Sequence, residues 1–363
     1  MIEKRFFLQF VFGAFFCSLL FGLRPSQAQT QESKPALQYD RITRAESIVW
    51  GFDFLNENQI IYTERRGRVH LLDLKTKVST EIKGAPKVWA RGQGGLLDIR
   101  VHPKDKSKIY MTFSEPKGED SATTSLAVAT LEKNQLTGLK ILFSANATTD
   151  ESIHFGSRIE FGNDGWLYIS IGDRNERKRS QDMSYHNGKV IRLKEDGSSA
   201  EIFTSGHRSP QGLVKHPQTG ELWLAEMGPR GGDELNLLVK GQNYGWPIVT
   251  YGREYWGPSI GVKEKPGFQA PVTYWVPSIS PSAITFYTGD VFQKWKGDLF
   301  MATLSGLHLR RLKIENNKVT EQEELLKEKG FRIRNVRTGP DGKIYISTDD
   351  GQIGALSPSA PTP

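Results

Sequence analysis

A hairpin pattern that recurs six times constrains the fold of this chain more than any other feature. In each copy, a short apolar strand leads into a turn with Asp, Asn, Pro or Gly, and a second strand of alternating apolar residues follows. The copies lie at residues 52–63, 99–112, 159–170, 213–225, 284–302 and 336–347. Turn residues between two stretches of period-two alternation predict antiparallel β-hairpins.

The spacing of the copies indicates the architecture. Successive hairpins begin about 45–70 residues apart, which suits one four-stranded blade of a closed radial repeat. We therefore predict an all-β fold, a six-bladed β-propeller of four-stranded antiparallel blades, with a pair of β-sandwiches as the alternative. Helical periodicity is nearly absent, and we expect at most a short helical turn at 321–329.

The N-terminus has the composition of a secretory signal. Lys4 and Arg5 precede an apolar run at 6–23, and the small-x-small sequence SQA at 26–28 provides a cleavage site. A membrane anchor is the alternative, although Gly and Ser interrupt the apolar run. We predict a cleaved signal at 1–28, a linker at 29–39, the propeller domain at 40–356 and a disordered tail at 357–363. The expected location is periplasmic or secreted, with no membrane span after cleavage.

Composition argues against two kinds of chemistry. The only cysteine, Cys17, lies inside the predicted signal, so the mature chain has no thiol for disulfides or metal–thiolate sites. Signal removal lowers the formal net charge from +7 to about +5, and no run of basic residues is interleaved with aromatic ones. Nucleic acid is therefore not an expected partner, whereas the basic excess suits an acidic small ligand.

The sequence MGPRGGDE at 227–234 indicates a cation site. Three glycines and a proline form a turn that exposes carbonyl oxygens, and Asp233 and Glu234 add adjacent carboxylates. Tyr244 follows ten residues after Glu234. Calcium takes about six to eight oxygen ligands from such a mixture of backbone and side chains. A tight loop with a solvated acidic pair is the alternative interpretation.

Polar side chains recur where the repeated hairpins begin or end. These residues are Gln93, His154, Asp173, Arg208, Arg332 and Arg334. A lone His beside a Gly is most often structural, and alternating arginines usually form a solvated face. The loops at one end of a propeller converge on its central channel, however. We therefore expect these groups around one pocket that suits an acidic, planar ligand.

Six ordered phrases carry a family resemblance. They are GQGGLLDI (92–99), HFGSRIEF (154–161), GHRSPQGL (206–213), GPRGGDELN (228–236), KGQNYGWP (240–247) and RIRNVRTGPDG (332–342). From about Glu46 to Leu356, the chain resembles the soluble aldose sugar dehydrogenases that use pyrroloquinoline quinone (PQQ), the soluble glucose dehydrogenase family. The resemblance implies a six-bladed propeller, PQQ and two calcium ions, one at the quinone and one structural.

The resemblance also assigns roles to single residues. His154 matches the general base of the family. The positions that match cofactor contacts are Gln93, Arg208, Ser209, Tyr255, Leu304, Ser305, Gly306, Arg332 and Arg334. Gly228 and Pro229 match the pair whose carbonyls hold the calcium at the cofactor. Glu234 and Tyr244 match ligands of the structural calcium.

The implied reaction explains these residue types. Oxidation of an aldose to its lactone removes a proton from O1 and a hydride from C1. A neutral imidazole at His154 suits the proton, and Asp173, nineteen residues later, is placed to hold the second ring nitrogen. A cofactor carbonyl carbon accepts the hydride, calcium polarises the quinone, and arginine forks pair with its carboxylates.

The chain departs from the family pattern at several positions. Ser209 stands where many relatives have Asn, and Ser305 stands where glucose-oxidising members have Lys. Met227 replaces a residue that is often polar, and Ser157 replaces a Gly. The connection at 196–202 is shorter than usual. These changes bear on the tightness of quinone binding and on the identity of the sugar, because a charged contact becomes a hydroxyl.

Three functions from different classes follow. The first is a PQQ- and calcium-dependent aldose sugar dehydrogenase with a small-molecule aldose substrate and an external electron acceptor, as a monomer or homodimer. The second is a calcium-dependent propeller lactonase or other hydrolase, which needs several Asp, Asn or Glu side chains on the metal. The third is a secreted, non-catalytic binding propeller that has lost the quinone. No Cys-x-x-Cys-His haem motif is present to name the acceptor.

Overall fold

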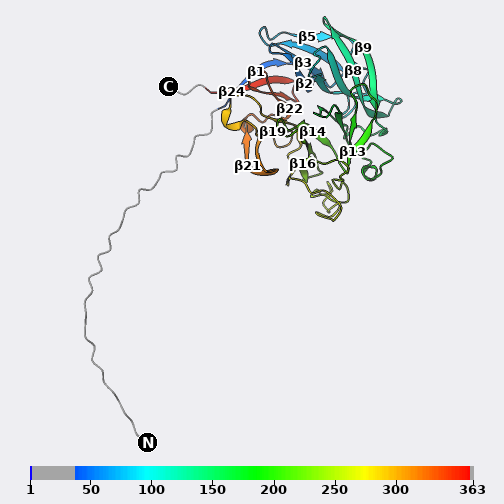
Figure 1. Cartoon of the computed structure of the whole chain (residues 1–363), viewed down its shortest axis with the longest axis vertical. Coiled ribbons are helices and arrows are strands. Elements are labelled where there is room, and N and C mark those ends of the chain that lie inside the picture. The colour runs from blue at the N-terminus through cyan, green and yellow to red at the C-terminus, as the bar shows by residue number, and fades with distance from the viewer. Residues whose placement is uncertain (2–36, 360–363) are drawn as a thin grey trace, which may run out of the picture. The chain divides into compact units, whose positions relative to one another are not determined.

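The computed structural model describes residues 37–359 together with Met1, and it is a six-bladed β-propeller. Its strands form six four-stranded antiparallel sheets arranged as blades (Figure 1). The predicted fold class is thereby confirmed. Apart from Met1, the predicted signal at 1–28 and most of the linker at 29–39 lie outside the described residues.

Five blades use four consecutive strands each. Blade 1 is β2 (Val49–Asn56), β3 (Gln59–Glu64), β4 (Arg68–Asp73) and β5 (Ser79–Ile82). Blade 2 is β6 (Leu96–Val101), β7 (Lys108–Pro116), β8 (Ala122–Glu132) and β9 (Gln135–Ser144). Blade 3 is β10 (Gly156–Phe161), β11 (Leu167–Ile171), β12 (Lys189–Leu193) and β13 (Glu201–Ser205). Blade 4 is β14 (Pro210–Lys215), β15 (Leu222–Glu226), β16 (Asp233–Leu238) and β17 (Thr273–Trp275). Blade 5 is β18 (Pro281–Phe286), β19 (Leu299–Thr303), β20 (Leu309–Glu315) and β21 (Lys318–Leu325).

The sixth blade closes the ring with strands from both ends of the chain. It contains β22 (Ile333–Thr338), β23 (Ile344–Thr348), β24 (Gln352–Pro358) and β1 (Leu37–Arg44). Strand β1 pairs antiparallel with β24 from Leu37↔Pro358 to Arg44↔Gln352, and the blue and red strands lie together in Figure 1. The sheet therefore extends slightly beyond both bounds of the predicted propeller at 40–356, and the tail residues 360–363 lie outside the described part.

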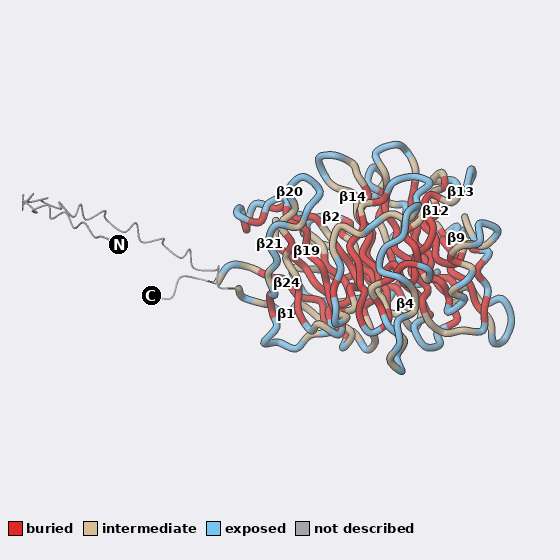
Figure 2. The backbone as a smooth tube through the Cα atoms, turned by 90° about the horizontal axis from the view of Figure 1, so that it is seen from below, coloured by how far each residue is buried: buried red, intermediate tan, exposed pale blue. Residues whose placement is uncertain are grey.

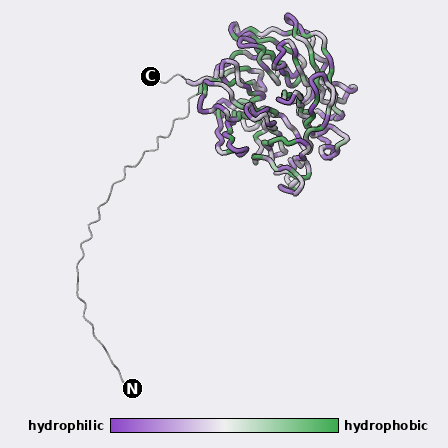
Figure 3. Tube along the Cα trace, in the orientation of Figure 1, coloured by the Kyte–Doolittle hydropathy of each residue, from purple (hydrophilic) through white to green (hydrophobic). Residues whose placement is uncertain are grey.

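Each of the six predicted hairpins forms the first two strands of one blade. The pairs are β2–β3, β6–β7, β10–β11, β14–β15, β18–β19 and β22–β23. The first strands are buried almost throughout because they face neighbouring blades. The buried strands occupy the interior in Figure 2, and exposed loops surround them. Figure 3 shows the same division as apolar stretches inside and hydrophilic loops at the periphery.

The core contains one hydrophobic cluster between each pair of neighbouring blades, and a further cluster includes Trp50, Leu97 and Phe155. Between blades 6 and 1, for example, Phe52 and Tyr62 pack with Tyr345 and Ile353. Between blades 2 and 3, Leu126 packs with Ile159, Ile169 and their neighbours. Burying these apolar surfaces between sheets stabilises the ring without disulfides.

The expectation of a helical turn at 321–329 is mostly wrong. Residues up to Leu325 belong to β21, and only the 3-10 helix at Lys327–Lys329 is helical. Charged side chains of β21 pair with the neighbouring strand β20. Glu321 and Glu323 of β21, for example, both bind Arg311 of β20. These cross-strand ion pairs favour a strand despite the high helix propensity of Glu and Lys. The other 3-10 helices are Arg177–Ser180 and Gln293–Trp295.

Candidate functional site

The loops that carry the predicted site residues open on one face of the propeller. In an antiparallel hairpin, the start of the first strand and the end of the second lie at the same edge. His154 precedes β10 and Asp173 follows β11, whereas Gln93 precedes β6 in the neighbouring blade. The repeat therefore brings residues that are distant in sequence to a common rim.

His154 and Asp173 form a buried pair. Nδ1 of His154 lies 2.7 Å from Oδ1 of Asp173, and the other carboxylate oxygen accepts a hydrogen bond from Nε1 of Trp246 at 2.8 Å. The His154 backbone N–H donates to Oε1 of Gln93 at 2.9 Å. With Nδ1 bound to a carboxylate, Nε2 is the ring nitrogen left to act on a ligand.

The surroundings keep this imidazole neutral. Burial lowers the pKa of His154, the hydrogen bond to Asp173 opposes that shift, and the positive charge of Arg208 adds to it, so that the pKa lies below its ordinary value. Burial by itself raises the pKa of Asp173, but the hydrogen bond to His154, the charge of Arg208 and the backbone N–H of Asn175 help to lower it overall. The pair is therefore an ionised carboxylate beside a neutral imidazole, as a general base requires.

Backbone packing fixes the position of His154. Its φ is 54°, in the left-handed region that few side chains adopt. Gly172 lies against this turn so closely that a Cβ there would be 1.9 Å from the His154 carbonyl oxygen. Only glycine fits at that position without a shift of the base.

Two adjoining cavities open among these loops and share Gln93, Met227, Leu304 and Arg332. One measures about 300 Å³, and its other polar lining residues are Arg65, Gln211, Arg334 and Asp349. The other measures about 540 Å³, and further residues in its lining are His154, Arg208, Ser209, Gly228, Tyr255 and Ser305. The base and the predicted anion contacts therefore face one continuous depression.

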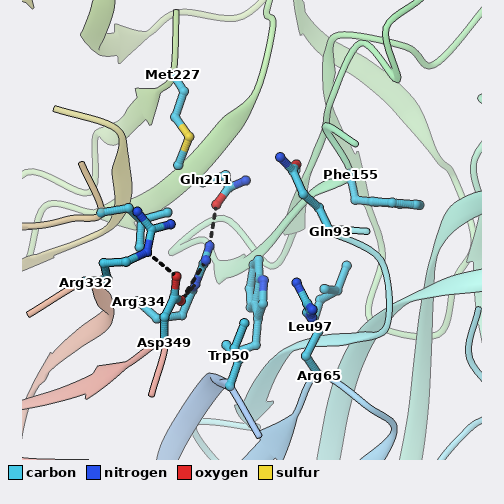
Figure 4. Close-up of a pocket in the computed structure, with 13 residues that line it drawn as sticks. Trp50, Arg65, Gln93, Leu97, Phe155, Gln211, Met227, Arg332, Arg334 and Asp349 are labelled. Carbon is cyan, nitrogen blue, oxygen red and sulfur yellow. Dashed lines mark hydrogen bonds and ion pairs between the residues drawn. The ribbon is translucent and has the colours of Figure 1, made fainter. Parts of the chain in front are cut away.

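Two arginines and one aspartate form a fixed group in the smaller cavity, shown in Figure 4. Asp349 accepts hydrogen bonds from Nε of Arg332 at 2.9 Å and from Nε of Arg334 at 2.8 Å. Arg334 also donates to Oε1 of Gln211 at 3.2 Å. One carboxylate shared by two guanidinium groups leaves a net positive charge and free N–H donors in the cavity.

Arg208 and Ser209 carry buried polar atoms that lack partners. Among the described residues, neither Nε of Arg208 nor Oγ of Ser209 has a hydrogen-bond partner. Arg208 is otherwise fixed, because its backbone N–H donates to Glu226 at 2.7 Å and Nη1 donates to the Met227 carbonyl at 3.0 Å. Unsatisfied buried donors in the wall of a cavity indicate a polar ligand.

The loop at 227–234 is organised by Asp233. Its carboxylate accepts hydrogen bonds from the backbone N–H groups of Gly228, Ile279 and Ser280 and from the Ser278 hydroxyl, at 2.7–2.9 Å. Burial raises the pKa of Asp233 to about 6, although these hydrogen bonds oppose the shift. Of the two adjacent carboxylates, Asp233 therefore holds the loop in shape, and only Glu234 is left for another partner.

Glu234 faces a second buried carboxylate. Asn236 donates to Glu226 at 3.2 Å and to Glu234 at 3.3 Å. Burial, and then the charge of Glu226, raise the pKa of Glu234 well above its ordinary value. A cavity of about 10 Å³ adjoins both glutamates and Tyr244, which is roughly the space that one water needs. The Tyr244 hydroxyl is bonded to the backbone at Leu237 and Val239, so only its carbonyl oxygen is free to ligate an ion.

Comparison with known proteins places this chain in a family. The model of the glucose/sorbosone dehydrogenase family matches residues 46–356. The chain belongs to the glucose/sorbosone dehydrogenase family. The match runs from before β2 to within β24 and includes strands of all six blades, and it confirms the resemblance found in the sequence.

Relatives of this dehydrogenase family agree in sequence and in structure. The chain is 36% identical over 332 residues to "Aldose sugar dehydrogenase YliI" of Escherichia coli strain K12, covering 85% of this chain and 90% of that protein. A structure described as "Crystal structure of glucose dehydrogenase" has a TM-score of 0.85 and 35% identity, covering 90% and 100% of the two chains. The PQQ-bound form of the aldose sugar dehydrogenase of Streptomyces coelicolor has a TM-score of 0.77 and 25% identity, covering 89% and 98%.

Most predicted site residues of this family member lie around the two cavities, and a few lie apart. Leu304 and Ser305 line the larger cavity, and the Ser305 hydroxyl bonds that of Ser280 at 2.7 Å. Gly306 is not among the lining residues. Tyr255 lines the larger cavity although it is 65% exposed.

The sequence prediction omitted several residues that shape the site. These are Trp50, Arg65, Arg158, Gln211, Glu226, Trp246 and Asp349. Asp349 could have been found, because it directly follows the second strand of its hairpin as Met227 and Leu304 do in theirs. Trp50 and Arg158 lie inside first strands, where a residue of the core and one of the site look alike in sequence.

Proposed function

We propose that this sugar dehydrogenase oxidises an aldose at C1 to the lactone with PQQ and calcium. The observation that carries the proposal is the placement of His154, held by Asp173 at 2.7 Å, in the same cavity as Arg332. A neutral base beside a cationic anion site suits a sugar and an acidic cofactor together. The relatives that are aldose sugar dehydrogenases by name support the same substrate class.

The residues present fit PQQ, a planar tricarboxylate. Arg332 and Arg334 retain donors beyond those that bind Asp349, and Nε of Arg208 and Oγ of Ser209 lack partners. We propose that these groups, with Gln93 and Tyr255, hold the quinone. Leu304 and Ser305 border the same space, and Gly306 is proposed to contribute only through the shape of their loop.

The residues also fit calcium at two places. Within residues 37–359, no group of three His, Cys, Asp or Glu side chains is placed to hold a metal, so carbonyl oxygens must supply most ligands. Gly228 and Pro229 are proposed to ligate the ion at the quinone. The Pro229 carbonyl accepts one hydrogen bond, from Arg253 at 3.0 Å, and keeps a second lone pair. Glu234 and the Tyr244 carbonyl are proposed for the structural ion, which would offset the repulsion between two buried glutamates.

The chain's own residues perform the proton transfer. Nε2 of His154 takes the proton of the C1 hydroxyl while Asp173 stabilises the imidazolium that forms. When bound, the quinone supplies the carbonyl carbon that accepts the hydride from C1, and calcium polarises that carbonyl. Phe155 and Leu97 give the adjoining smaller cavity apolar surface, which limits water there.

Reconstitution tests the proposed function. Purified protein is mixed with calcium and PQQ, and dye reduction is followed with glucose, other aldoses and disaccharides. We expect dye reduction that depends on quinone and sugar, and none in His154→Ala, which should still bind quinone. Unchanged turnover in His154→Ala would remove this residue from the mechanism.

The alternative functions predict other results. A hydrolase would cleave lactones without quinone, but among the described residues no set of acidic side chains converges on a metal position. A binding propeller would give neither dye reduction nor a spectral change on quinone addition. The buried donors without partners at Arg208 and Ser209 favour the dehydrogenase.

The proposed location is periplasmic or secreted. The supporting observation is the signal-like composition of residues 1–28, which lie outside the described part of the chain except for Met1. Among the residues that the structure describes, no helix has the length and apolar character to cross a membrane. The electron acceptor is proposed to be a separate molecule.

A further inference from the structure

Arg65 occupies a repeat position that faces the cavities in other blades. It directly follows β3, the second strand of blade 1, as Met227 follows β15, Leu304 follows β19 and Asp349 follows β23. All four residues line the smaller cavity. The backbone of Arg65 is fixed on both sides, since its N–H donates to the Ile48 carbonyl and its carbonyl accepts from Leu96.

The guanidinium of Arg65 has no hydrogen-bond or ion-pair partner in the described part of the chain, and Asp349 attracts it only at longer range. No hydrogen bond or ion pair links it to any carboxylate, although it is half-buried. Asp349 is already shared between Arg332 and Arg334. The charged groups of the cavity are therefore three arginines and one aspartate. A desolvated cation without a partner is costly, and an anionic ligand removes that cost.

The arrangement of the cations matches a ligand with separated anionic groups. In Figure 4, Arg65 lies on one side of Trp50, and the Arg332–Asp349–Arg334 group lies on the other. Trp50, Leu97 and Phe155 provide apolar surface in the same cavity. A neutral aldose offers no charge to Arg65, whereas a rigid tricarboxylate offers several.

Resting on the proposed function, we infer that Arg65 is a third arginine for the quinone and pairs with a carboxylate that Arg332 and Arg334 do not hold. Arg65 thus binds the cofactor rather than the sugar. Its contribution should appear in quinone affinity and be sensitive to ionic strength, because charge pairs at a partly exposed site are screened by salt.

Quinone binding to the apo-protein measures this contribution directly. PQQ is titrated into wild type, Arg65→Gln, Arg65→Lys and Arg66→Gln in the presence of calcium, by fluorescence quenching at low and high salt. Arg66 is the matched control, since it is the exposed neighbour of Arg65. We expect Arg65→Gln to weaken binding about 10- to 100-fold at low salt, the range for loss of a charge-assisted hydrogen bond. The deficit should shrink at high salt, Arg65→Lys should recover part of it, and Arg66→Gln should match wild type.

Two results would overturn the inference and leave the proposed function intact. One is equal quinone affinity in Arg65→Gln and wild type. The other is a raised KM for the aldose in Arg65→Gln with unchanged quinone affinity, which would place Arg65 at the sugar. Failure of the wild-type protein to bind quinone at all would overturn the proposed function and this inference with it. Equal melting temperatures of the apo-proteins exclude misfolding as the cause of any loss.

Discussion

At the scale of single residues, the proposed proton transfer depends on how a histidine in an unusual backbone conformation is kept neutral. His154 has a φ of 54°, and its Nδ1–H donates to the Asp173 carboxylate at 2.7 Å. Trp246 fixes the other oxygen of that carboxylate. Orientation comes from Asp173, and neutrality comes from burial and from the charge of Arg208.

The lowered pKa of His154 sets the direction of the pH dependence. The neutral imidazole is the active form, so kcat/KM should fall as pH drops through a pKa below the ordinary value of about 6.5. In Asp173→Asn the carboxylate no longer favours the imidazolium, so the acid limb should move to lower pH and kcat should fall on the order of 10²-fold or more. A pH profile of dye reduction checks both changes. An acid limb that stays in place would show that Asp173 does not act through His154.

The sequence predicts the residues that act on a ligand better than the residues that hold them in position. His154, Arg332 and Arg334 could be predicted because they lie beside recognisable strands and match family phrases. Trp246 could not, because it is distant in sequence and reaches Asp173 through a loop that no periodicity describes. In the sequence, Asp233 and Glu234 form one acidic pair, and only the fold shows that the Asp233 oxygens already accept hydrogen bonds from the loop.

At the scale of elements, the position of His154 depends on close packing between the loop before β10 and the loop after β11 in blade 3. The start of β10 and the end of β11 approach so closely that Gly172 touches the His154 carbonyl. The hairpin itself was predictable from period-two alternation. The contact was not, because it depends on how the two loops bend after the strands end.

Gly172→Ala tests this contact. Its Cβ would lie 1.9 Å from the His154 carbonyl oxygen, so the turn must shift and turnover should fall about 10²-fold, the typical cost of a base displaced by about 1 Å. Gly165→Ala is the control, because no atom lies within 4 Å of its Cβ position; it should keep turnover despite the strain of its φ of 75°. Steady-state kinetics of the folded variants decide, and normal kcat in Gly172→Ala would refute the packing argument.

The loop after β15 provides a second test at this scale. If calcium offsets the repulsion between Glu226 and Glu234, calcium should raise the melting temperature of the wild-type protein. Glu234→Gln removes one of the two charges, so it should melt higher than wild type without calcium and respond less to calcium. Thermal unfolding with calcium and with a chelator gives the comparison. An equal calcium response in both proteins would place the ion elsewhere.

At the scale of the whole molecule, one side chain joins all six blades at the centre of the ring. Arg158, in β10, pairs with Asp98 at 3.0 Å and donates to the carbonyls of Gln211, Ser282 and Arg334. Its guanidinium also lies 4.2 Å from the ring centre of Trp50. These partners come from the first strands of the other five blades. The sequence could predict the number of blades from the repeat, but not which residue fills the centre.

Arg158→Lys should destabilise the ring strongly. A lysine has three donors on one nitrogen and cannot reach four blades, which leaves buried acceptors unsatisfied. We expect a loss of about 3–5 kcal/mol, the typical cost of breaking a buried ion pair, measured by denaturant unfolding. Arg91→Lys, in an exposed ion pair with Asp120, is the control and should change stability by less than about 1 kcal/mol. Equal stability of the two variants would show that the central guanidinium is dispensable.

Quinone binding and turnover measured together in His154→Ala test the central claim most directly. The claim is that arginines hold the cofactor independently of the base that acts on the sugar. It predicts that His154→Ala binds PQQ with near wild-type affinity in the presence of calcium and reduces no dye with any aldose. Dye reduction at the wild-type rate, or loss of quinone binding together with turnover, would contradict it.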